Sequence, residues 1–237
     1  MTQISIRLPA YYKENMVLQQ GVINRIYGQT KANSEITILL ERFPVSSLNK
    51  RQGKDDECVI VFSDKEETNS KGFFKFHLPI FEGSHDYYRL SLRLGKQACV
   101  INKIYFGEVW LAIGESNMSM PSRYTDVRED IEEYASLRNL HFYTMAEYGL
   151  ADDEENFLYH PTGKIVDGQW LTPNKENFLD VSAIALSFAG NLQKSLKFPV
   201  AVYDLAASDT MLHSWLPRDV IEKNQLIKDH LIQINHY

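Results

Sequence analysis

Phe106–Pro121, which read FGEVWLAIGESNMSMP, are the residues on which the predicted fold depends. Val109–Ile113 form a short apolar run with β-branched and aromatic residues, which is the composition of a buried strand. The run ends at Gly114, and Ser116 and Asn117 follow, two residue types that favour turns and helix caps. A serine that follows such a strand lies at the carboxyl edge of a sheet, where open α/β sheets bind ligands and nucleophile elbows place their serine. Two interpretations remain open, because Ser116 is either a nucleophile or only the cap of the next helix.

The residues before this stretch, 1–105, have the pattern of an all-β domain. Apolar and polar residues alternate in several short runs, and polar turns separate these runs. Period-two alternation is typical of strands with one buried and one exposed face. Such runs without a helical pattern between them predict a β-sandwich of the jelly-roll type. The expected strands are Ile4–Leu8, Asn24–Gln29, Glu35–Glu41, Cys58–Phe62, Gly72–Leu78, Tyr88–Leu94 and Ala98–Tyr105.

The residues from 106 to 237 alternate between strand and helix patterns. Besides Val109–Ile113, the expected strands are Leu140–Tyr143 and Val200–Leu205. Helical patterns cover Arg128–Leu137, Ser182–Leu196 and a last segment that begins near Pro217. Strand and helix in alternation predict a parallel α/β sheet. With about three parallel strands, where such sheets typically have about five or six, the sheet is expected to be incomplete.

The helix expected at Ser182–Leu196 has the clearest helical period of the chain, and Asp180 or Ser182 is its expected cap. The acidic stretch Glu147–Gly168 is expected to be a long surface loop. The predicted buried face of the helix consists of Ala185, Ala189, Leu192 and Leu196, with Ile184 and Phe188 beside it.

Composition and charge exclude several classes of function. Among the 237 residues, 44% are hydrophobic and 24% are charged, which predicts a folded chain. A net charge of −6 without a clustered Lys/Arg stripe predicts that nucleic acid is not a partner. No apolar run approaches the roughly 18 residues of a membrane span, and no signal-peptide pattern is seen, so no membrane partner and a cytoplasmic location are expected. Cys58 and Cys99 are expected to be buried thiols, and neither a metal nor a cofactor is expected, because no His/Cys/Asp cluster has ligand spacing.

Three segments of the chain match blocks of one known family. They are MVLQQG at Met16–Gly21, GEVWLAIGESNMSMP at Gly107–Pro121 and FPVAVYDLAASDTMLHSW at Phe198–Trp215. In these blocks and in their order, the chain resembles the sialate O-acetylesterases of the SGNH hydrolase superfamily, and the resemblance implies their N-terminal portion. It implies a β-sandwich at 1–105, followed at 106–237 by an incomplete SGNH-hydrolase-like α/β domain with flavodoxin-like three-layer architecture.

The resemblance also implies roles for individual residues. Ser116 aligns with the nucleophile that attacks an acetyl ester of a sugar, and its backbone N–H would be one oxyanion donor, with Asn117 beside it in the substrate site. Ser208 and Asp209 replace a Gly-Gly pair that supplies a second backbone donor. Glu115 stands where the family has Gln, which places a carboxylate near the developing oxyanion. The family's remaining Asn donor and its Asp-x-x-His base block are not found in the sequence, and the resemblance implies that they lie further along.

The catalytic base and the function therefore remain open at this stage. His213, five residues after Ser208, is a candidate base, although it is also consistent with a surface or partly buried histidine without a catalytic role. The first functional hypothesis is removal of O-acetyl groups from sialic acid by serine acyl transfer; an acetylxylan-type esterase is a close variant. The other hypothesis is a catalytically incomplete homologue that acts as a carbohydrate-binding or interaction module. The expected partners are an acetylated sugar, and a second chain or a missing C-terminal half that completes the α/β sheet.

Overall fold

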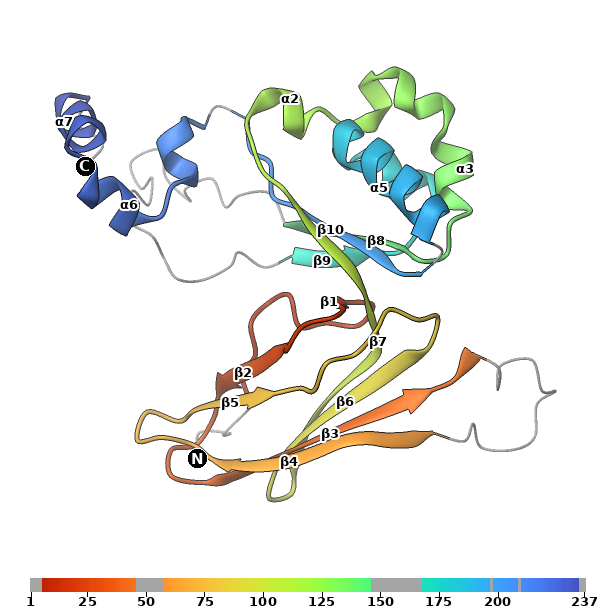
Figure 1. The fold of residues 1–237 in the computed structure, drawn as a ribbon, viewed down its shortest axis with the longest axis vertical. Coiled ribbons are helices and arrows are strands. Elements are labelled where there is room, and N and C mark those ends of the chain that lie inside the picture. The colour runs from red at the N-terminus through yellow and green to blue at the C-terminus, as the bar shows by residue number, and fades with distance from the viewer. Residues whose placement is uncertain (1–5, 46–57, 146–167, 197, 209, 235–237) are drawn as a thin grey trace.

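One long strand links the two halves of the structure. The computed structural model describes residues 6–45, 58–145, 168–196, 198–208 and 210–234. Strand β7 (Gln97–Ala112) runs from the all-β half, drawn below, into the half with helices, drawn above (Figure 1). The halves therefore share one mixed sheet, with the order β4-β3-β6-β7-β10-β8-β9.

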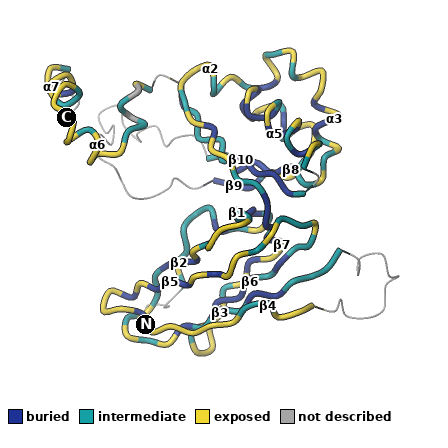
Figure 2. Tube along the Cα trace, in the orientation of Figure 1, coloured by how far each residue is buried: buried dark blue, intermediate teal, exposed yellow. Residues whose placement is uncertain are grey.

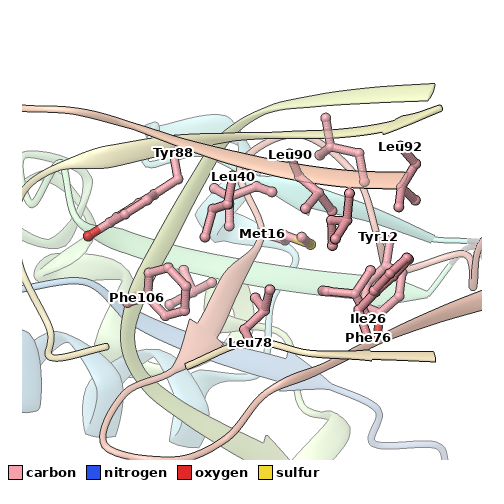
Figure 3. Packing of buried hydrophobic residues seen from close by; sticks show 14 of the residues in the cluster. Tyr12, Met16, Ile26, Leu40, Phe76, Leu78, Tyr88, Leu90, Leu92 and Phe106 are labelled. Atoms are coloured by element: carbon pink, nitrogen blue, oxygen red, sulfur yellow. The ribbon is translucent and has the colours of Figure 1, made fainter. Parts of the chain in front are cut away.

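The first half contains two sheets that bury side chains against each other. β4 (Val59–Glu67), β3 (Glu35–Phe43), β6 (Tyr87–Leu94) and the start of β7 form an antiparallel sheet, and β2 (Arg25–Gln29) pairs with β5 (Phe73–His77) in a separate one. The predicted alternation is confirmed along β2, β5 and most of β3 and β6, where alternate side chains are buried, whereas no residue of β4 is buried. Figure 3 shows members of this common core from both sheets, including Ile26, Leu40, Phe76, Leu90 and Leu92.

The two strands predicted at Ala98–Tyr105 and Val109–Ile113 are one continuous strand, β7. The predicted break between them is therefore wrong. β7 pairs with β6 up to Ile104, and then its neighbours change to β1 (Val17–Gln19) and β10 (Val200–Asp204). The backbone continues through this exchange at Gly107, where a Cβ would lie 1.9 Å from the Pro199 carbonyl oxygen. Only a glycine allows this close approach of the two chain segments.

The second half is built on three parallel strands, as predicted. β10 lies between β7 and β8 (Leu140–Met145) and is parallel to both. The structure adds β9 (Gly168–Leu171), which is antiparallel to β8 and too short to show a periodic pattern in the sequence. The predicted loop Glu147–Gly168 lies outside the described residues except for Gly168, with which β9 begins.

Helices cover the parallel strands and enclose a second core. α5 (Ala183–Leu196) is the main helix, and Ala185, Leu186 and Ala189 pack with Phe142 and Val202 of the sheet. The shorter elements of this half are α2 (Ser116–Ser119), 3₁₀ turns at Ser122–Tyr124, Asp126–Glu129 and Leu212–Trp215, α3 (Ile131–Ala135), α4 (Lys175–Leu179), α6 (Arg218–Lys223) and α7 (Gln225–Gln233).

Several local predictions are corrected. Ile184 and Phe188, predicted beside the buried face, are about half exposed, because Ala185, Leu186 and Ala189 form the part of α5 that packs on the sheet. The last predicted helix is two helices, since the extended backbone of Asn224 ends α6 and its side chain caps α7. The Arg128–Leu137 helix is shortened to α3 after a 3₁₀ turn.

The first predicted strand and the predicted burial of the two cysteines also differ from the structure. The described part of Ile4–Leu8 makes only an isolated bridge between Arg7 and Gln29. Cys58 is exposed at the end of β4 and Cys99 is half-buried, and both are free thiols. Burial is concentrated in the strands of both halves, whereas α6 and α7 are mostly exposed (Figure 2). Within the described residues, no helix has the length and apolar character needed to span a membrane.

Candidate active site

Ser116 lies in a tight turn that follows the carboxyl end of β7. Gly114 in this turn has φ +147°, a conformation that side-chain-bearing residues rarely adopt. The segment after β10 runs alongside the turn: the Leu205 N–H donates to the Ala112 carbonyl at 3.0 Å, and the Ala207 N–H donates to the Gly114 carbonyl at 2.9 Å. The turn is therefore fixed at the edge where β7 and β10 both end.

The Ser116 hydroxyl is exposed and donates a hydrogen bond to Oε2 of Glu115. The backbone of Glu115 begins α2, because its carbonyl accepts the N–H groups of Met118 at 2.9 Å and Ser119 at 3.1 Å. Asn117 is the next residue of α2 and is exposed as well. The turn thus presents a hydroxyl, a carboxylate and an amide side chain to solvent.

The second predicted block of site residues meets this turn. Oγ of Ser208 and Oγ of Ser119 are hydrogen-bonded at 2.7 Å, and Ser119 Oγ also donates to the carbonyl of Ser116 at 3.3 Å. Ser208 is therefore joined to the Ser116 turn through one intervening serine. Asp209, predicted beside it, lies outside the described residues.

His213 is half-buried in the 3₁₀ turn at Leu212–Trp215 that follows Ser208. The start of this segment is held locally: Trp215 Nε1 donates to Thr210 Oγ1 at 3.1 Å, and that hydroxyl donates to the Ala207 carbonyl at 2.7 Å. The Ser116 hydroxyl donates its hydrogen bond to Glu115. The role of His213 as a base stays a prediction.

Asp204 and Ser182 lie next to the segment that carries Ser116 and are hydrogen-bonded to each other. Neither was singled out as a site residue from the sequence. Asp204 is the last residue of β10, and its carboxylate accepts the N–H of Ser182 at 2.8 Å and the N–H of Ala206. Burial raises the pKa of Asp204, and these two backbone N–H groups partly oppose that rise. Its place at the end of a buried strand was the signal available in the sequence.

Ser182 connects this carboxylate to the serine turn. Its hydroxyl accepts the Ala185 N–H at 3.2 Å, which caps α5, and it lies 3.6 Å from the Met118 sulfur in α2. The next residue, Ala183, donates its N–H to the Met120 carbonyl at 2.9 Å. The chain that leaves α2 is therefore anchored to the start of α5.

The Val-Leu-Gln segment near the N-terminus also supports β7, which the sequence did not reveal. Gln19 Oε1 accepts the Val109 N–H at 2.8 Å. Gln20 donates to Glu108 Oε1 at 2.8 Å and accepts the Gly83 N–H at 2.7 Å. The two glutamines thus satisfy polar groups along the part of β7 that leads to the serine, and their role is structural.

The described residues contain no group of three or more His, Cys, Asp or Glu side chains that could hold a metal ion. The chemistry visible at the site is that of a hydroxyl next to a proton acceptor. A serine in this setting can act as a nucleophile when an adjacent group accepts its proton.

No family model matches the chain. A sialate O-acetylesterase of Pongo abelii is 23% identical over 223 residues, which are 90% of this chain and 39% of that protein. A sialate O-acetylesterase of Mus musculus is 21% identical over 230 residues, 92% of this chain and 39% of that protein. The chain therefore spans about two fifths of the length of these curated relatives.

Among solved structures, a carbohydrate acetylesterase from Xanthomonas citri superposes with a TM-score of 0.73 at 18% identity, covering 93% of this chain and 45% of that one. The mixed sheet with its helices thus resembles the corresponding part of that acetylesterase's fold. The sequence matches confirm the predicted resemblance to the sialate O-acetylesterases.

Proposed function

We propose that this chain carries the nucleophile of a carbohydrate esterase that removes O-acetyl groups from a sugar, with sialic acid as the first candidate. The observation that carries the proposal is the exposed Ser116 hydroxyl, held in a glycine-dependent turn at the carboxyl edge and linked to Ser208. The names of the relatives and of the structural neighbour support the substrate class.

In the proposed reaction, Ser116 Oγ attacks the carbonyl carbon of the acetyl ester. The sugar oxygen leaves, an acetyl-serine forms, and water then releases acetate. The Ser116 N–H and a backbone N–H at Ser208 or Asp209 are the proposed oxyanion donors. Losing one such donor typically costs about 2.7–4 kcal/mol of transition-state stabilisation, so the conformation around Ser208 bears directly on the rate.

We further propose that the first half is a jelly-roll-like β-sandwich and that the second half is part of an SGNH hydrolase domain whose sheet is completed by additional polypeptide. The exposed side of β7 supports this. Among the described residues, Glu108–Ala112 pair with β10 on one side and have no strand on the other. Leu111 on this edge is 64% exposed, and a bare apolar edge strand promotes association with another strand.

A second candidate function is an incomplete homologue that binds carbohydrate or another protein without catalysis. The observation that favours it is the Ser208 side chain, which takes the place of a glycine and directs its hydroxyl to Ser119. The Ser208 hydroxyl is thereby engaged with Ser119, whose Oγ also donates to the Ser116 carbonyl at 3.3 Å.

Acetate release decides between these functions. The wild-type chain and Ser116→Ala are compared on O-acetylated sialic acid and on acetylated xylan, with Ser195→Ala as the matched control because its hydroxyl is exposed on α5. Loss of acetate release in Ser116→Ala but not in the control supports the esterase, and the preferred substrate identifies the sugar. Full activity of Ser116→Ala would contradict the nucleophile, and binding without acetate release would favour the incomplete homologue.

A further inference from the structure

The Ser116 hydroxyl has a carboxylate, not an imidazole, as its hydrogen-bond acceptor. Its Oγ donates to Oε2 of Glu115, and both side chains are exposed at the carboxyl edge of β7. A serine needs an adjacent base to act as a nucleophile at neutral pH, and a base must first be within hydrogen-bond reach of the proton it takes. We propose that Glu115 is the general base for Ser116 in this chain, an inference that rests on the proposed function of Ser116.

The backbone fixes Glu115 next to the hydroxyl. Glu115 has extended backbone angles, φ −99° and ψ −155°, and its carbonyl accepts the N–H groups of Met118 and Ser119. The preceding Gly114 is itself tied to Ala207 by a hydrogen bond of 2.9 Å. The backbone of the residue that carries the carboxylate is therefore held on both sides, directly before Ser116.

Proton transfer to Glu115 avoids the repulsion that a carboxylate at this position would otherwise exert on the substrate oxyanion. An ionised Glu115 would repel the oxyanion that forms on the substrate carbonyl, since both carry negative charge. When Glu115 accepts the Ser116 proton, it becomes neutral as the oxyanion develops. The negative charge has then moved from Glu115 to the substrate, and the two charges never coexist.

The proton and bond changes balance over the cycle. The Oγ–H proton passes to Glu115 Oε2 while Oγ bonds to the acetyl carbon, and Glu115 returns this proton to the sugar oxygen as the ester bond breaks. In the second step, water attacks the acetyl-serine and gives its proton to Glu115. Glu115 passes the proton to Ser116 Oγ as acetate leaves, which restores the starting state.

Two other titratable groups of this half, Asp204 and His141, are poorly placed to act as the base. The Asp204 carboxylate is mostly buried and accepts the N–H groups of Ser182 and Ala206. The His141 imidazole is buried within β8, with 2% of the residue exposed, and cannot reach a substrate at the surface. His213 is the competing base from the sequence, and the experiment separates it from Glu115.

The test measures how fast a fluorophosphonate probe labels Ser116, with p-nitrophenyl acetate hydrolysis as a second reading. The probe needs an activated serine but releases fluoride without an acid, so its labelling rate does not depend on protonation of the leaving group. Glu115→Gln keeps the size and one acceptor oxygen but loses the proton acceptor, and it is expected to label at least about 100-fold more slowly. The matched control is Glu129→Gln, an exposed glutamate in a neighbouring turn, which is expected to label at the wild-type rate.

Each outcome supports or overturns the proposal. If Glu115→Gln labels as fast as wild type or faster, the carboxylate only repels the oxyanion and the inference is wrong while Ser116 remains the nucleophile. If His213→Gln loses most of the labelling rate while Glu115→Gln labels at the wild-type rate, the base is His213 and not Glu115. Absence of labelling in the wild-type chain would overturn both the base and the proposed function. Circular dichroism of each variant confirms that it is folded.

Discussion

Replacing His141 by phenylalanine is expected to stabilise the fold, and the gain should increase as the pH falls. His141 lies on β8 with 2% of its surface exposed, and its ring packs 4.9 Å from the ring of Tyr105. Neither of its ring nitrogens has a hydrogen-bond partner in the part of the chain that the structure describes. Burial therefore lowers the pKa of His141 from 6.5 to about 4.

The direction of the pH dependence of stability follows from whether the folded or the unfolded chain binds the proton. Above pH 6.5 the imidazole is neutral in both states, and its titration contributes nothing to stability. Between 6.5 and about 4 the unfolded chain binds a proton that the folded chain does not, so stability is lost as the pH falls through this window. The loss approaches about 3 kcal/mol at its limit, and is about 2 kcal/mol at pH 5.

Phenylalanine removes this loss and keeps the ring contact with Tyr105. It also removes two buried nitrogens that have no partner among the described residues, each of a kind that costs about 1–3 kcal/mol, although its slightly larger ring offsets part of that gain. The free energy of unfolding is measured by urea denaturation at neutral pH and near pH 5. The control is His77→Gln, which removes an exposed imidazole from β5. If His141→Phe shows the same loss of stability between the two pH values as wild type, the explanation by a buried neutral histidine is refuted.

Three further changes test the packing and the charges. Gly107→Ala should lower the thermal midpoint strongly, because its Cβ would lie 1.9 Å from the Pro199 carbonyl oxygen; an unchanged midpoint would contradict the close crossing. Arg89→Met should cost about 1 kcal/mol near neutral pH, because Arg89 makes two 2.8 Å hydrogen bonds to Glu41 but is partly exposed to water. The same pair lowers the pKa of Glu41, so wild-type stability from it should fade on acidification, and the difference between the two proteins should narrow in urea titrations at low pH. Leu90→Ala should cost about 2–5 kcal/mol, since the side chain is 1% exposed in the first core, and a loss below 1 kcal/mol in urea unfolding would show a loosely packed core.

Strands β3, β5 and β6 of the first half could be predicted because apolar and polar residues alternate within each of them. Leu90 and Leu92 alternate with polar residues, and both are buried as that pattern requires. The continuity of β7 could not be predicted, because a strand that changes partners at Gly107 looks like two strands in the sequence. Cys58 was misjudged for a related reason, since an apolar context does not show that a residue lies at an exposed strand end.

The site was predictable as a set of segments but not as a set of contacts. The position of Ser116 after a strand, and of Ser208 after another, follows from the edge at which parallel strands end. The bonds from Ser116 to Glu115 and from Ser119 to Ser208 depend on how the turn closes, which no spacing encodes. Asp204 escaped notice for the same reason, because its partner Ser182 comes from a different element.

If Ser116 is a nucleophile, its covalent intermediate can be trapped. The chain is quenched in acid during turnover of p-nitrophenyl acetate, digested, and examined by peptide mass spectrometry. We expect an added acetyl group on Ser116 that is absent from Ser116→Ala, together with loss of ester hydrolysis in that variant. Hydrolysis at the wild-type rate in Ser116→Ala, with no acetyl group on Ser116 in the wild-type chain, would contradict it.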